Sequence, residues 1–174
     1  MIGPRHVFPL IALAVTACSP SLNWRETRPE NSGVRLTFPC KPSAQTRELA
    51  LAGRPVSMQL HSCQAADATF ALTVADMVDP TFVTPALREL RAAALRNLGP
   101  QAKGTAGPPF NVAGMTPNPE ASRGIYAGSL PDGKAVQEQA AFFAVGTRVY
   151  QATVLGAMDA EAVDLFFESI KPIQ

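Results

Sequence analysis

Residues 135–155 read AVQEQAAFFAVGTRVYQATVL, and the fold prediction depends on this stretch more than on any other. Two runs, Ala135–Val145 and Arg148–Leu155, flank the dipeptide Gly146-Thr147. The aromatic and β-branched residues of the runs are typical of strands, and glycine supplies the positive φ that a two-residue hairpin turn requires. The stretch therefore predicts an antiparallel β-hairpin.

Apolar and polar residues alternate in several other segments, which is typical of strands with one buried face. Two of them flank a turn at Ala52-Gly53-Arg54-Pro55, and another precedes the turn Pro131-Asp132-Gly133. The segments predicted as strands are Val34–Phe38, Thr46–Leu51, Val56–Cys63, Ala68–Met77 and Arg123–Leu130, and the alternation is clear in Val34–Phe38 and Ala68–Met77. Together with the hairpin they predict an antiparallel sheet of about six to seven strands.

Two segments show the helical period instead. The first is predicted to have Thr84 as its N-cap and Pro85 in its first turn, and to end before Gly99. The second is predicted to begin after an N-cap at Asp159. Their apolar stripes are Leu87, Leu90, Ala94 and Leu98, and Val163, Phe166, Phe167 and Ile170. The order of strands, helix, strands and helix predicts an α+β domain in which two main helices flank the sheet.

Length and composition limit the class of protein. The chain has 174 residues, of which 47% are apolar and 17% charged, with a net charge of +1, and these values fit one globular domain. The balanced charge argues against a nucleic-acid-binding protein, because such proteins carry a basic excess or stripe. The proline-rich segment Gln101–Glu120 is predicted to be a loop with one short strand around Phe110–Val112.

The N-terminus has the layout of an export signal. Arg5 precedes the apolar run Val7–Val15, which is too short for a membrane-spanning helix of about 20 residues. The following Val15-Thr16-Ala17-Cys18 resembles a bacterial lipobox. That resemblance implies a signal peptide over residues 1–17, a diacylglyceryl thioether on Cys18 and cleavage before it. The alternative is an ordinary secretory signal that is cut nearby, with Cys18 incidental.

Lipidation would place the chain on a membrane. A diacylglyceryl group and an N-acyl chain on Cys18 bury enough CH₂ groups for effectively permanent anchoring. Ser19 in the second mature position resembles lipoproteins that are sorted to the outer membrane of Gram-negative cells. The sequence therefore predicts an outer-membrane lipoprotein on the periplasmic side.

Residues 18–33 lack periodicity and are predicted to be a lipidated tether that precedes the domain at 34–174. Trp24, the only tryptophan, has two interpretations. It either rests at the lipid headgroups, where aromatic residues collect, or packs back on the domain as a plug.

Cys40 and Cys63 remain after Cys18 is used by the lipid, and 23 positions separate them. An exported domain meets oxidising machinery, so a disulfide is predicted between the two. The alternatives are two buried thiols, or a metal site that adds His61 to the sulfurs. No metal and no cofactor is expected.

No nucleophile, phosphate-loop or metalloprotease motif occurs in the sequence. The alternative function is an envelope hydrolase that uses His61 with Asp76 or Asp79. A lone polar residue on an amphipathic strand and a pair of turn carboxylates are simpler interpretations. The charged residues Arg88, Arg91, Arg96, Glu161, Asp164 and Glu168 are predicted to lie on solvated helix faces, and the alternative for the three arginines is a site for an acidic partner.

The layout resembles the PsbP-like fold, an antiparallel sheet between helices. The points of resemblance are Phe38-Pro39-Cys40-Lys41-Pro42, Asn97-Leu98-Gly99, the hairpin Phe143–Val154 and Ser169-Ile170-Lys171. Cys18-Ser19-Pro20, Asn23-Trp24-Arg25 and the later cysteines also look like a group of uncharacterised bacterial lipoproteins. PsbP-like domains serve mainly as binding or assembly modules, so this resemblance implies a non-catalytic role with another envelope protein or a small ligand as partner.

Overall fold

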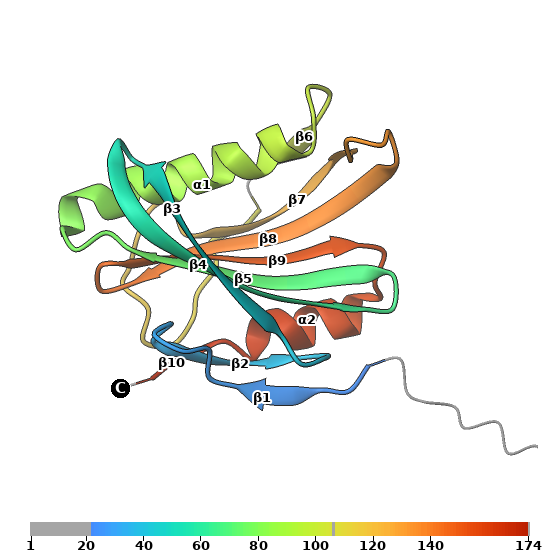
Figure 1. Cartoon of the computed structure of the whole chain (residues 1–174), viewed down its shortest axis with the longest axis horizontal. Coiled ribbons are helices and arrows are strands. Elements are labelled where there is room, and N and C mark those ends of the chain that lie inside the picture. Colours follow the sequence, from blue (N-terminus) through green and yellow to red (C-terminus); the bar gives the residue numbers. More distant parts are fainter. Residues whose placement is uncertain (1–21, 106, 174) are drawn as a thin grey trace, which may run out of the picture.

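The computed structural model describes residues 22–105 and 107–173, which form two antiparallel sheets and two α-helices (Figure 1). The large sheet has, in spatial order, β3 (Ser43–Leu51), β4 (Arg54–Ala65), β5 (Ala68–Asp76), β9 (Arg148–Gly156), β8 (Ala135–Val145), β7 (Ser122–Ser129) and β6 (Lys103–Thr105). The small sheet has β1 (Arg25–Thr27), β2 (Val34–Phe38) and β10 (Lys171–Pro172), with β2 in the centre. The helices are α1 (Val83–Asn97), which follows the 3-10 turn η1 (Pro80–Phe82), and α2 (Ala160–Glu168).

The elements form three layers. Helix α1 covers one face of the large sheet, while α2 and the small sheet cover the other face (Figure 1). This arrangement confirms an α+β domain with antiparallel strands and two flanking helices. The described strands outnumber the six to seven predicted, because the small sheet adds strands of two to five residues. The predicted signal peptide at 1–17 lies outside the described residues.

Two meanders meet at the centre of the large sheet. Strands β3, β4 and β5 follow one another along the chain, as do β7, β8 and β9. The meanders join through β5 and β9, in a register that sets Ala68 opposite Gly156 and Asp76 opposite Arg148. The predicted hairpin at 135–155 is confirmed, because β8 and β9 pair from Val145 with Arg148 outward. Gly146 in its turn has a φ of 59°.

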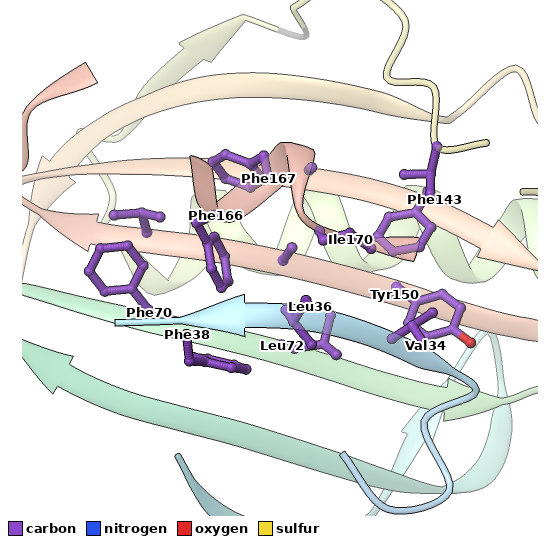
Figure 2. Packing of buried hydrophobic residues seen from close by; sticks show 14 of the residues in the cluster. Val34, Leu36, Phe38, Phe70, Leu72, Phe143, Tyr150, Phe166, Phe167 and Ile170 are labelled. Carbon is purple, nitrogen blue, oxygen red and sulfur yellow. The ribbon is translucent and has the colours of Figure 1, made fainter. Parts of the chain in front are cut away.

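The α2 face of the large sheet carries an aromatic core. Phe166 of α2 lies edge-on to Phe38 of β2 at 5.4 Å and to Phe70 of β5 at 5.3 Å (Figure 2). Phe143 and Tyr150 stack at 4.7 Å further along the same face. The predicted stripe of the second helix is therefore buried, and Asp159 accepts a hydrogen bond from the Ala162 amide as its N-cap.

The α1 face is packed by the stripe that the sequence predicts, since Leu87, Leu90, Ala94 and Leu98 are all buried. Gly99 ends the helix with a φ of 87°. The predicted N-cap at Thr84 is wrong by two residues. The α-helix begins at Val83 because η1 precedes it, and η1 is capped by Asp79, which accepts from the Thr81 amide at 2.9 Å.

The segment between α1 and β7 also differs from the prediction. Residues 110–112 form no strand, and the short strand of this region is β6, which pairs with β7. Phe110 instead turns its ring into the core, 5.8 Å from Phe143 and 6.2 Å from Phe167. Packing of this partly buried ring, rather than strand pairing, fixes the loop against the α2 face.

Strand β3 forms one edge of the large sheet. Its side chains are exposed from Ser43 to Ala50, on both faces, and only Leu51 is buried. Helix α1 reaches this strand at its buried end, where the Glu89 carboxylate accepts from the Ala52 amide at 2.6 Å. Over residues 22–105 and 107–173, no helix is both long and apolar enough to cross a membrane.

Candidate functional site

The N-terminal end of the described chain belongs to the folded domain. The Asn23 amide donates to the Pro39 carbonyl at 2.7 Å, and Arg25 of β1 lies opposite Phe38 of β2. Trp24 meets Phe70 edge-on, with ring centroids 6.0 Å apart. The tether predicted over 18–33 is therefore wrong from Asn23 onward, because this segment pairs and packs. Of the two interpretations of Trp24, the plug is the one observed; Cys18 and Ser19 lie outside the described residues.

A disulfide joins Cys40 and Cys63, whose Cα atoms are 6.0 Å apart. Cys40 follows β2 of the small sheet, and Cys63 lies on β4 opposite Phe70 of β5. The bond therefore ties the small sheet to the large one beside the Trp24 plug. It also removes the free-thiol and metal alternatives for these two sulfurs. Among the described residues, no group of three His, Cys, Asp or Glu side chains could hold a metal ion.

His61 lies two residues before Cys63 on the same face of β4, opposite Leu72 of β5. The side chain is 6% exposed, and its Nε2 has no hydrogen-bond partner in the described part of the chain. Burial lowers the pKa of His61 below its ordinary value, which favours the neutral ring. The described chain therefore supplies no hydrogen bond that fixes the orientation of Nε2.

Asp76 and Asp79 lie at the far end of β5 from His61. Asp76 is four residues beyond Leu72, so it lies about 13 Å further along the strand. The Asp76 carboxylate accepts from the Val78 amide at 2.9 Å and from the Thr147 hydroxyl at 2.6 Å. The structure does not bring the histidine and these carboxylates together, and both aspartates serve turns.

The charges of α1 are arranged differently from the prediction. Arg88, which is exposed as predicted, and Arg91, which is half-buried, both bind the carboxylate of Glu120 in the loop before β7. The hydrogen bond from Arg88 is the main cause that lowers the pKa of Glu120. Arg96 is exposed, as predicted. On α2, Glu161 and Glu168 are exposed, whereas Asp164 pairs with Arg123 of β7 at 2.7 Å.

Sequence reasoning missed a buried polar group on the α1 face. Glu138 of β8 lies directly opposite Tyr126 of β7, and their side chains are 6% and 1% exposed. Burial raises the pKa of Glu138 to about 7, although hydrogen bonds from Gln151 and Thr153 lower it. The Tyr126 hydroxyl and Arg91 Nε have no hydrogen-bond partner among the described residues. The sequence did carry a signal, because Glu138 lies two and four residues before Ala140 and Phe142 and therefore shares their face of β8, which α1 covers.

Comparison of the chain with protein-family models, and with curated proteins, found no match. Function is therefore inferred from the residues and their geometry. The structure brings the N-terminal plug and the disulfide together at one end of β5. The carboxylates of Asp76 and Asp79, which cap two tight turns, lie at the other end of this strand.

Proposed function

We propose that the protein is a lipid-anchored lipoprotein of the bacterial cell envelope that binds a partner rather than catalysing a reaction. The observation that carries the proposal is the disulfide between Cys40 and Cys63, because disulfides persist in oxidising compartments such as the periplasm. Its presence agrees with an export signal over residues 1–17. The lipobox-like residues before Cys18 supply the anchor, and Ser19 favours the outer membrane.

The folded N-terminal plug sets how far the domain lies from its anchor. Asn23 is already hydrogen-bonded to Pro39, so the connection runs only from Cys18 to Asn23. Five residue steps span at most about 17 Å when fully extended. In the lipidated protein the end of the domain that carries Trp24 is therefore held close to the bilayer.

A binding role is supported by what surrounds the candidate catalytic groups. The Nε2 atom of buried His61 has no hydrogen-bond partner among the described residues, and the nearest predicted carboxylate lies about 13 Å along the sheet. The resemblance to PsbP-like domains, which act mainly as binding or assembly modules, favours the same role. The hydrolase alternative makes the opposite prediction for a His61 variant.

The anchor is tested by substituting Cys18→Ser in the full-length protein and comparing it with a Ser21→Ala control. The wild type and the control are expected to partition into detergent and to have the mass of a chain that begins at Cys18 and carries acyl groups. The Cys18→Ser variant is expected to lack those groups and to be uncleaved or soluble. A native product that begins at Met1 without fatty acids contradicts the proposal.

The non-catalytic role is tested by complementing a deletion strain with a His61→Ala variant. Complementation equal to wild type is expected, with Gln59→Ala on the same strand face as the control. Loss of function in His61→Ala, with an unchanged urea unfolding midpoint, would instead support the hydrolase.

A further inference from the structure

The turn Met77–Asp79, between β5 and η1, has a strained backbone. Val78 has a φ of 62°, and the Asp79 amide donates to the Met77 carbonyl at 2.6 Å, which closes a three-residue turn. Three-residue turns with a positive central φ are rare and strained. For a β-branched residue such as valine, the left-handed region is a genuine outlier.

The surroundings hold this turn in one conformation. Met77 is buried on the α1 face, and its amide donates to the Thr147 carbonyl at 3.1 Å. The Asp76 carboxylate accepts from both the Val78 amide and the Thr147 hydroxyl. On the other side, Asp79 caps η1. Because both flanks are fixed, Val78 is displayed rigidly.

These contacts explain why the chain turns here, but they do not explain why the central residue of the turn is valine. The hydrogen bonds of Val78 use its backbone, and the residue is 81% exposed. Glycine or asparagine would form the same turn with less strain. Contacts of the Val78 side chain within the described chain therefore do not offset the conformational strain of a valine at this position. A rigid apolar group of this kind binds without a cost for ordering it.

The surface around Val78 is electrically balanced. Asp76 lies 3.7 Å from the Arg148 guanidinium, and Asp79 lies within the field of Arg54, which stacks on the Phe82 ring at 4.7 Å. Two acidic and two basic side chains thus neutralise one another. A partner that fits this surface presents a shallow apolar socket and needs no net charge, so its affinity is expected to depend little on salt.

The turn lies at the opposite end of the sheet from the N-terminal plug. Phe70, which holds Trp24, and Asp76 are six residues apart on β5, a distance of about 20 Å. In Figure 1 the start of β1 and the β4–β5 turn lie at the right, whereas the chain passes from β5 to α1 at the left. In a lipid-anchored chain, the Val78 end therefore points away from the bilayer.

We propose that the Val78 turn is the contact point for a protein partner in the envelope, which receives the Val78 side chain in an apolar socket. This deepens the binding role proposed above and rests on it. Only its orientation relative to the bilayer depends on the lipid anchor, because the contact itself is between folded surfaces.

The test begins with a photo-crosslinking amino acid placed in the full-length protein in cells at position 78. Positions 125 and 165 serve as controls, because Ile125 and Leu165 are exposed apolar residues elsewhere on the domain. A discrete adduct with one other protein is expected at position 78 alone. An adduct with lipid or with a second copy of the chain, or equal adducts at all three positions, overturns the proposal.

The partner identified in this way is then purified, and its affinity is measured for the wild type and for Val78→Gly, Val78→Ala and Leu165→Ala. Both Val78 variants are expected to bind about tenfold more weakly, since a buried valine side chain contributes this much, and Leu165→Ala is expected to bind like wild type. The urea midpoint of Val78→Gly is expected to equal or exceed that of wild type, which separates lost contact from unfolding. Unchanged affinity in both Val78 variants overturns the proposal. Failure of the Cys18 experiment leaves this measurement unaffected.

Discussion

The two faces of the large sheet are covered in different ways. The α2 face is covered by segments from both ends of the chain, which pack around Phe166 and are fastened by the disulfide. Its buried Tyr150 hydroxyl donates to the Ser32 carbonyl at 2.6 Å. The α1 face is covered mainly by one helix, and beneath it lie Tyr126, whose hydroxyl has no described partner, and the buried carboxyl of Glu138.

Because of this difference, we expect reduction to destabilise one face of the sheet and rising pH to destabilise the other. Reduction acts on the α2 face, because the disulfide bond lies at its edge. Rising pH acts on the α1 face, because its buried carboxyl must ionise without an ion-pair partner among the described residues. Each prediction below alters one face and leaves the other as its reference.

The largest effect is expected from Cys40→Ser combined with Cys63→Ser. Closing a loop of 23 residues stabilises the fold by about 3 kcal/mol through the entropy of the unfolded chain, so the free energy of unfolding falls by that amount. Urea denaturation measures the change. A reductant should lower the wild-type midpoint equally and leave the variant unaffected, and a wild-type midpoint that resists complete reduction would contradict the prediction.

The second prediction concerns the change of the free energy of unfolding with pH, which Glu138→Gln is expected to remove. The folded pKa of about 7 lies above the ordinary value of 4.5, so the folded state holds the proton more tightly than the unfolded state. The stability that Glu138 contributes is therefore fully present below pH 4.5 and is lost as the pH rises to about 7. The loss approaches about 3 kcal/mol at pH 8.

The measurement is urea denaturation at pH 5 and pH 8. Glu138→Gln should abolish most of the difference between the two values, whereas Glu161→Gln on the exposed face of α2 should retain it. If Glu138→Gln shows the same change between the two pH values as the wild type, the prediction for Glu138 is contradicted.

The smallest effect compares the two buried tyrosines. Tyr150→Phe removes a satisfied hydrogen bond and is expected to lower the free energy of unfolding by about 1 kcal/mol. Tyr126→Phe removes a hydroxyl without a described partner and is expected to leave stability unchanged or to raise it by up to about 1 kcal/mol. The same sign for both variants in thermal or urea unfolding would show that the two hydroxyls are in equivalent environments.

Local patterns were enough to predict the elements whose neighbours are close in sequence. The β8–β9 hairpin and the buried stripe of α1 follow from a period of two and a period near 3.6 residues. The Cys40–Cys63 bond followed from the compartment that the N-terminus implies. The hairpin and the α1 stripe were predictable because each pattern lies within one segment. The disulfide was predictable because the expected compartment is oxidising.

Contacts between segments that are far apart in the sequence could not be predicted from such local patterns. Strand β10 pairs with β2 although Lys171 and Arg35 are 136 positions apart, and the two residues of β10 are too few to show a strand pattern. β1 escaped detection because its three residues are ordered by β2 and by the contact of Trp24 with Phe70. The left-handed turn at Val78 was unpredictable for a simpler reason, since valine is among the residues least suited to it.

The exposed edge strand β3 also bears on assembly. Residues directly opposite in an antiparallel ladder either exchange both backbone bonds or neither, and these states alternate along a strand. Two copies of β3 related by a two-fold axis therefore pair odd positions with odd ones and even positions with even ones, so Arg47 never lies opposite the Glu48 of the other copy. Full overlap of the nine residues instead sets Arg47 against Arg47, and moving the axis one residue sets Glu48 against Glu48. In the lipid-anchored protein proposed above, whose copies would be crowded in two dimensions, this repulsion between like charges would oppose growth of the sheet by self-addition at β3.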